Sequence, residues 1–109
     1  MQIRQLSAPQ LAARLAEAQA PAPQLLDVRE PWEVALGTLP GALAIPMGQL
    51  PARLAELDAR RPVVCVCHHG VRSLHAAAFL LRRGFADVSN LSGGVDAWAC
   101  EVDPRFPTY

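Results

Sequence analysis

The chain has 109 residues, which is the size of one compact domain and leaves no room for two. Hydrophobic residues make up 51% and charged residues 18%, so the chain can bury a core and does not have the composition of a disordered segment. Ten arginines, with no lysine, balance ten acidic residues. Because the arginines are scattered along the chain, nucleic acid and anionic membranes are poor candidates for a partner.

Nothing in the sequence resembles a targeting or membrane segment. Residues 1–10 are polar at nearly every second position and lack the apolar core of a secretory signal. No apolar run approaches the ~20 residues needed to span a bilayer. Three cysteines are too few, and odd in number, for a disulfide scaffold. We therefore expect a cytoplasmic protein with free thiols and no membrane contact.

The first elements are a strand and a helix. Alternating polar and apolar residues predict a short strand over 2–6. Ser7 and Gln10 have the spacing of a capping box, and the helix that they open is expected to run to about Gln19, before the segment 21–23 with its two prolines. The apolar side of this helix is formed by Leu11, Leu15 and Ala18.

The middle of the chain alternates in the same way. An apolar run predicts a buried strand over 25–28, and residues 30–33 suit the first turn of a short helix, with an early proline and acidic side chains near the positive end of the helix dipole. A brief strand is expected at 44–45. Helical spacing then predicts a helix ending near Asp58, with Leu50, Leu54 and Leu57 on its apolar side.

The strongest strand signal lies at residues 63–67, which are all apolar, as in a central parallel strand covered on both faces. A helix is expected over 73–83, then a strand over 88–91 and a final helix after the glycines at 93–94. The apolar face of the first of these helices would consist of Leu74, Ala77, Ala78 and Leu81. This alternation predicts a single α/β domain with a mostly parallel central sheet and helices on both faces.

Cys67 is the candidate reactive residue. It falls where the most buried strand meets a turn into a helix, and ligands of such sheets bind at the carboxyl ends of strands. The loop 68–72 can present successive backbone N–H groups to one centre, and the helix adds the positive end of its dipole. Arg72 and protonated His68 or His69 could add positive charge. Together these groups would stabilise a thiolate.

Four motifs carry a family resemblance. Residues 67–73 read Cys-His-His-Gly-Val-Arg-Ser; the other three motifs are 26–30 with Glu33 following, 37–42, and 91–94 with Trp98 following. In this order and spacing they resemble the rhodanese-like sulfurtransferases, whose active-site loop is Cys-x-x-Gly-x-Arg-Ser. The resemblance is clearest over residues 20–109. One departure is Thr38, which stands where the family usually has histidine, so we expect a local change in that turn.

The resemblance implies a persulfide mechanism without a cofactor. A small anionic donor such as thiosulfate would transfer its outer sulfur to the catalytic Cys67, and a thiol, cyanide-like or protein acceptor would remove it. Substrate would be bound by the loop residues His68, His69, Gly70, Val71, Arg72 and Ser73. Asp27 and Arg29 would support the loop. They could simply pair at the surface, but the position of Asp27 at a strand end favours an ion pair with Arg72.

Several alternatives compete with this interpretation. The domain could be a sulfur carrier or a docking module with little turnover of small molecules. A related fold serves phosphatases, but their loops have one residue more between cysteine and arginine than the four found here, and Ser73 stands where their arginine would be. His68 and His69 could bind a metal, yet adjacent histidines on a turn tend to diverge, so no metal is expected. Cys65 and Cys100 are interpreted as core residues.

Overall fold

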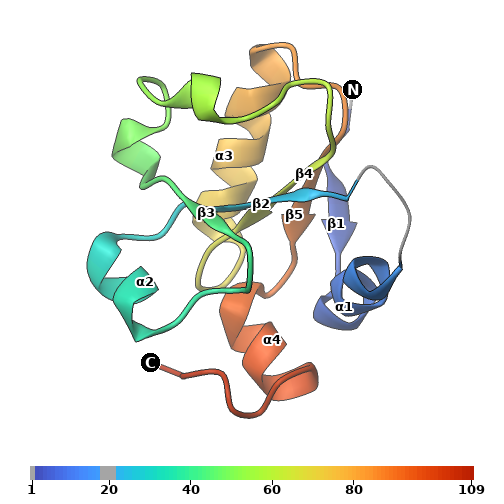
Figure 1. Ribbon diagram of the computed structural model, residues 1–109, viewed down its shortest axis with the longest axis vertical. Coiled ribbons are helices and arrows are strands. Elements are labelled where there is room, and N and C mark those ends of the chain that lie inside the picture. Colours follow the sequence, from blue (N-terminus) through green and yellow to red (C-terminus); the bar gives the residue numbers. More distant parts are fainter. Residues whose placement is uncertain (1, 18–21) are drawn as a thin grey trace.

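The structure, a computed structural model, describes residues 2–17 and 22–109. Its strands are β1 (Arg4–Leu6), β2 (Gln24–Asp27), β3 (Leu43–Ala44), β4 (Val63–Val66) and β5 (Val88–Leu91). They form one sheet in the order β1-β5-β4-β2-β3, and all four neighbouring pairs are parallel (Figure 1). The strand predicted to be central, β4, lies in the middle of the sheet and is buried along its whole length.

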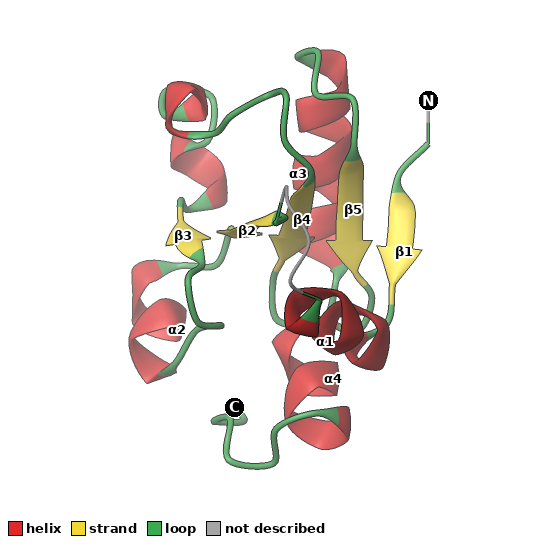
Figure 2. Cartoon of the chain, turned by 45° about the vertical axis from the view of Figure 1, so that its right-hand side comes forward, coloured by secondary structure: helices red, strands yellow, loops and turns green. Residues whose placement is uncertain are grey.

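Helices cover both faces of this sheet. They are α1 (Ala8–Ala16), α2 (Pro31–Leu36), α3 (Val71–Arg82) and α4 (Gly94–Glu101). In Figure 2, α1 lies in front of the sheet and α3 behind it. Successive residues of β4 therefore pack into two different cores: Val63 and Cys65 on the side of α3, and Val64 and Val66 on the side of α1 and α4. The predicted α/β class, with a parallel sheet and helices on both faces, is confirmed.

Over residues 2–17 and 22–109, no helix has the length and apolar character that crossing a bilayer requires.

The first helix begins as predicted. Ser7 and Gln10 form the reciprocal capping box, with each side chain accepting a hydrogen bond from the other residue's backbone N–H. Leu11 is fully buried, but Leu15, which was predicted on the same buried side, is 38% exposed. The other predicted positions, Ala18 and Gln19, lie outside the described residues, as does Pro21 of the predicted stop.

The prediction of an α-helix that ends near Asp58 is wrong. The segment instead holds two short 3-10 helices, Met47–Gln49 and Leu54–Glu56, separated by turns. Pro51 has no N–H to continue an α-helical ladder, which favours these short pieces. The leucine spacing had correctly marked the inward side, since Leu50 and Leu57 are buried against the core on the side of α3.

Two further predictions about helices are wrong in detail. The buried face of α3 is rotated relative to the predicted one and consists of Ser73, Ala76, Ala77 and Leu80. Three of these four side chains are small, which allows the helix axis to approach the sheet closely. Cys100, interpreted above as a core residue, is exposed near the end of α4. Cys65 is buried in β4 as expected.

The start of α4 holds the loop that follows β4. The backbone N–H of Val95 donates to the carbonyl of Cys67 at 2.9 Å, and that of Asp96 donates to the carbonyl of His68 at 3.1 Å. Gly94 has a φ of +62° and packs so tightly on these two carbonyls that a Cβ at this position would overlap them. The double glycine is therefore required for close contact between α4 and the loop, as well as for the turn.

Candidate functional site

The site is built around the sulfur of Cys67, immediately after β4. Its side chain is almost completely buried, with 1% exposed. Two backbone N–H groups donate to its Sγ, that of Gly70 at 3.1 Å and that of Ser73 at 3.3 Å, and the Ser73 hydroxyl lies 3.2 Å from the same sulfur. The predicted convergence of loop amides on one centre is present in the structure.

The backbone of Gly70 makes this convergence possible. It adopts a left-handed conformation with a φ of +95° just before α3 begins, and a Cβ there would lie 3.1 Å from both the Leu91 carbonyl oxygen and the Gly93 nitrogen. Glycine meets both constraints without strain. The loop thus turns sharply enough for the first amides of α3 to face the sulfur.

Hydrogen bonding at Cys67 favours the thiolate. Burial opposes ionisation, but the Ser73 hydroxyl and the N–H groups of Ser73, Gly70 and His69 outweigh it, so the pKa of Cys67 lies below its ordinary value. Cys65 provides the contrast on the same strand, since burial without such donors raises its pKa to about 12. Only one of these two neighbouring cysteines is therefore prepared to react as a thiolate.

The ion pair that holds Arg72 is not the predicted one. Its guanidinium binds Glu33 of α2 in a two-pronged contact, Nη1 to Oε1 and Nη2 to Oε2, the latter at 2.9 Å. Glu33 is 3% exposed and also accepts hydrogen bonds from the Glu30 N–H at 3.0 Å and the Tyr109 hydroxyl at 2.6 Å. The bond from Arg72 is the main cause that lowers the pKa of Glu33 to about 2. The loop is thus tied to α2.

Asp27 pairs with Arg29 rather than with Arg72, so the expected Asp27–Arg72 contact is wrong. The Arg29 Nη2 lies 2.8 Å from Asp27 Oδ2, and the pair is buried rather than at the surface. Only one residue separates the partners, so Arg29 folds back over the strand end and occupies the carboxylate. Arg29 also donates to the carbonyls of Gly37 and Glu33, at 2.6 and 3.4 Å. Its support therefore reaches the loop indirectly, through α2.

Thr38 fits into the same network. Its hydroxyl donates to Asp27 Oδ2 at 2.7 Å, so threonine acts as a hydrogen-bond donor where the family resemblance leads one to expect histidine. The departure from the motif changes this turn locally and leaves the contacts of Cys67 unaffected.

The two histidines of the loop stack instead of diverging. The rings of His68 and His69 are 3.8 Å apart, and the ring of Tyr109 lies 4.0 Å from the other face of His68. Burial and the neighbouring His69 lower the pKa of His68, which favours its neutral form at pH 7. A protonated His68 therefore does not account for thiolate stabilisation. Val71, another predicted binding residue, is 64% exposed, so its side chain faces solvent.

The structure brings Asp96 close to His68 and His69, the two residues that the sequence analysis had considered as metal ligands. Their ligand atoms lie within 4.8 Å of one another. The stacked imidazole planes differ by only 24°, so the nitrogen lone pairs run in nearly parallel planes and do not converge on one point. The 3.9 Å approach of His69 Nε2 to Asp96 Oδ2 is a contact between two partly exposed side chains at the surface.

Sequence reasoning missed three features of the site. It did not identify Glu33 as the partner of Arg72, and it did not identify Asn90 or Tyr109 as site residues. Asn90 had a signal, because a polar side chain near the carboxyl end of a buried strand needs partners. The acidic Glu33 had been interpreted only through the helix dipole. Tyr109 lies 76 positions from Glu33 in sequence, and no local pattern connects the two.

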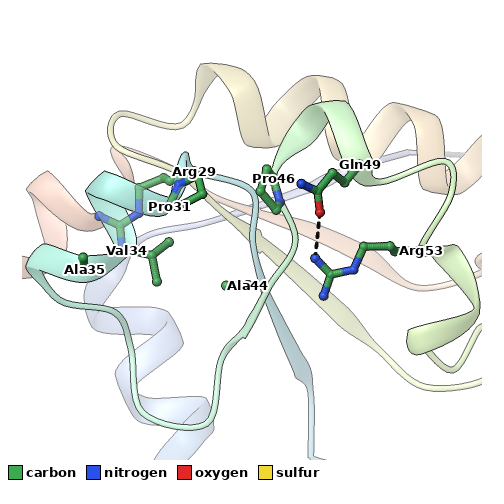
Figure 3. Close-up of a pocket in the computed structure, with 8 residues that line it drawn as sticks. All are labelled: Arg29, Pro31, Val34, Ala35, Ala44, Pro46, Gln49 and Arg53. Carbon is green, nitrogen blue, oxygen red and sulfur yellow. Dashed lines mark hydrogen bonds between the residues drawn. The ribbon is translucent and has the colours of Figure 1, made fainter.

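A separate pocket of about 380 Å³ lies beside α2 and β3 (Figure 3). Its wall is largely apolar and includes Val34, Ala44 and Pro46. Arg53 lies on its rim, where its guanidinium binds Gln49 and Glu56. Cys67 does not line this pocket, so the pocket is distinct from the sulfur site.

Comparison with known proteins gives a consistent result. The family model described as "Rhodanese-like domain" matches residues 7–101. The match begins earlier in the chain than residue 20, where the motif resemblance began. A sulfurtransferase of Allochromatium vinosum is 39% identical over 97 residues, which cover 89% of this chain and 89% of that protein. The thiosulfate sulfurtransferase GlpE of Pseudomonas paraeruginosa is 38% identical over 91 residues, covering 84% of this chain and 80% of that protein.

Solved structures agree with the sequence comparison. A rhodanese-like domain protein from Staphylococcus aureus superposes with a TM-score of 0.82 at 32% identity, covering 88% of this chain and 91% of the other. The human single-domain sulfurtransferase TSTD1 superposes with a TM-score of 0.79 at 26% identity, covering 92% and 98% of the two chains.

The Glu33–Arg72 bond should be visible in acid unfolding. Because the pKa of Glu33 is lowered from 4.5 to about 2 in the folded protein, its contribution to stability is complete above pH 4.5 and is lost as the pH falls towards 2. We expect the free energy of unfolding of the wild type to fall more steeply in this window than that of Glu33→Gln, so that the two curves converge.

Urea unfolding at a series of pH values measures this difference. Glu56→Gln is the control, because Glu56 pairs with Arg53 at the surface, where ion pairs contribute little. A gap between wild type and Glu33→Gln that stays constant from pH 4.5 to 2 would contradict the assignment.

Proposed function

Because this chain belongs to the rhodanese-like domain family, we propose that it is a sulfurtransferase that carries sulfur as a persulfide on Cys67. The observation that carries the proposal is the convergence of the Gly70 N–H and of the N–H and hydroxyl of Ser73 on the sulfur of Cys67. Fixed donors around a buried sulfur stabilise an anion there, as the attacking thiolate requires.

Thiosulfate is the donor that we propose, in line with the name of the GlpE relative. The thiolate of Cys67 attacks the outer sulfur of thiosulfate, the S–S bond of the donor breaks, and its electron pair leaves with sulfite. One thiolate and one dianion give one persulfide anion and one dianion, so atoms and charge balance. In this step the negative charge moves from Sγ of Cys67 to the outer sulfur of the persulfide.

In the second half-reaction an acceptor nucleophile attacks the outer sulfur of the persulfide. The electron pair of the S–S bond then returns to Cys67 as the thiolate. A thiol, a cyanide-like anion or a protein nucleophile can fill this role. No cofactor is required in either half-reaction.

Arg72 contributes through position more than through charge. Its guanidinium is bound by the Glu33 carboxylate at two points, and this carboxylate offsets most of its positive charge. Arg72 follows Gly70 by two residues and lies beside Ser73, so fixing it fixes the amides that face the sulfur. We infer that its main task is to hold the loop, with Asp27 and Arg29 supporting α2 behind it.

A protein acceptor is the second candidate. Trp32 and Val71 are 63% and 64% exposed, which are high values for large apolar side chains. Both lie next to members of the Glu33–Arg72 pair, so a partner seated on them would lie beside the site. In that case the domain would serve mainly as a sulfur carrier.

We also infer a reducing compartment, such as the cytoplasm, because the described residues include three free cysteines. The phosphatase alternative loses support from Ser73, which is fully buried against the sulfur and cannot supply a charged pair of donors to a phosphate.

The covalent intermediate gives the first test of this function. Incubation with thiosulfate should raise the intact mass by one sulfur atom, because Cys67 combines a lowered pKa with converging donors. Cys65→Ser and Cys100→Ser are the matched controls and should still gain the sulfur, whereas Cys67→Ser should not.

A Cys67→Ser protein that gains sulfur would overturn the assignment. Turnover with thiosulfate and cyanide then separates the sulfurtransferase from the sulfur carrier. A sulfurtransferase that uses small donors turns over many times, whereas a carrier accepts one sulfur and stops.

Arg72 gives the second test. If the two-pronged contact with Glu33 is what matters, Arg72→Lys should lower kcat/KM for thiosulfate by at least about tenfold, which corresponds to ~1.4 kcal/mol of transition-state stabilisation, because lysine cannot reproduce a planar pair of donors. Steady-state kinetics at low salt measures the change. Arg53→Lys is the control for a surface arginine, and full activity of Arg72→Lys would show that charge alone suffices.

A further inference from the structure

Asn90 connects the sulfur site to the neighbouring strand. It lies near the carboxyl end of β5, beside β4, and only 2% of it is exposed. Its amide nitrogen donates to the Gly70 carbonyl and to Gln5 Oε1, each at 3.0 Å. Its amide oxygen meets the hydroxyl of Ser73. Asn90 therefore touches Gly70 and Ser73, two of the residues whose donors face Cys67.

The orientation of the Asn90 amide follows from its partners. A backbone carbonyl can only accept, so the Asn90 NH₂ must face Gly70. The amide oxygen is then left facing Ser73 and can itself only accept. A hydrogen bond between Ser73 and Asn90 thus requires the hydroxyl of Ser73 to donate.

Ser73 cannot satisfy both of its neighbours at once. Its hydroxyl has one proton, and its oxygen lies within hydrogen-bonding reach of the Asn90 oxygen and, at 3.2 Å, of the Cys67 sulfur. When Cys67 is a neutral thiol, its S–H can donate to Ser73 and the Ser73 proton can go to Asn90. When Cys67 is a thiolate, two acceptors face one proton.

We propose that Asn90 is a positioning residue that competes with the sulfur of Cys67 for the single hydroxyl proton of Ser73. The proton turns towards the sulfur when the thiolate forms. It returns to Asn90 when Sγ becomes the neutral, bonded sulfur of the persulfide and loses its strength as an acceptor. This second step rests on the proposed function, whereas the competition itself requires only that Cys67 ionises.

The competition predicts the sign of the coupling between Ser73 and Asn90 in a double-mutant cycle. With Asn90 present, Ser73→Ala should raise the pKa of Cys67 only slightly, because the hydroxyl is partly withdrawn from the sulfur. In an Asn90→Leu background, where the hydroxyl has lost its Asn90 acceptor, the same substitution should raise the pKa by about one unit more. Arg72 and Cys65, whose charges interact with that of Cys67, are unchanged in all four proteins, as are His68 and His69 of the loop.

The pH dependence of the rate of Cys67 alkylation measures these values. Ser89→Ala is the control on the same strand, because the buried Ser89 hydroxyl has no hydrogen-bond partner within residues 2–17 and 22–109, and it should leave the pKa of Cys67 unchanged. Equal effects of Ser73→Ala in the two backgrounds would overturn the competition, and so would a larger effect with Asn90 present, which would mean that Asn90 directs the hydroxyl to the sulfur.

A second measurement needs no substitution at Asn90, in case that variant does not fold. The carboxamide ¹³C shift of Asn90 should change at the pKa of Cys67 in the wild type and lose this inflection in Ser73→Ala. No inflection in the wild type, or the same inflection in both proteins, would contradict the proposal. Both measurements report ionisation rather than sulfur transfer, so their failure is distinct from failure of the persulfide mass test.

Discussion

An anionic sulfur at the end of a buried strand needs hydrogen-bond donors that are already in place, and this requirement shapes the surroundings of Cys67. The sulfur is 1% exposed, so water cannot supply those donors. The Gly70 and Ser73 amides supply them instead, and backbone groups can do so only while the loop keeps one conformation. The close packing of Gly94 on the loop carbonyls is one contact that fixes it.

Two ion pairs extend this support, one behind the other. The buried pair of Asp27 with Arg29 fixes the entry to α2, and α2 in turn carries Glu33 to Arg72. Tyr109 joins the two pairs, since its hydroxyl accepts from Arg29 at 3.1 Å and donates to Glu33 at 2.6 Å. Buried ion pairs often add little net stability because desolvation opposes them. We infer that the buried pair of Asp27 with Arg29 contributes mainly geometry, and that both pairs keep the loop donors aimed at the sulfur.

Sequence reasoning was strong for elements and for the nucleophile, and weak for side-chain pairing. The apolar run of β4 and the turn after it placed Cys67 correctly, because burial and strand ends leave a local pattern. The partner of Arg72 could not be chosen in the same way. Both Asp27 and Glu33 lie in the matching motif. Arg29 occupies the Asp27 carboxylate and leaves Glu33 to Arg72, and this pairing depends on the three-dimensional structure.

The central claim is that the loop donors overcome burial and stabilise the thiolate of Cys67. The most direct measurement is the pH dependence of the iodoacetamide alkylation rate in the Cys100→Ser protein, which removes the exposed cysteine and leaves Cys65 as a buried thiol with a pKa of about 12. The account predicts a midpoint below the ordinary value of 9.0. A midpoint at or above that value would show that burial outweighs the loop donors and would contradict the account.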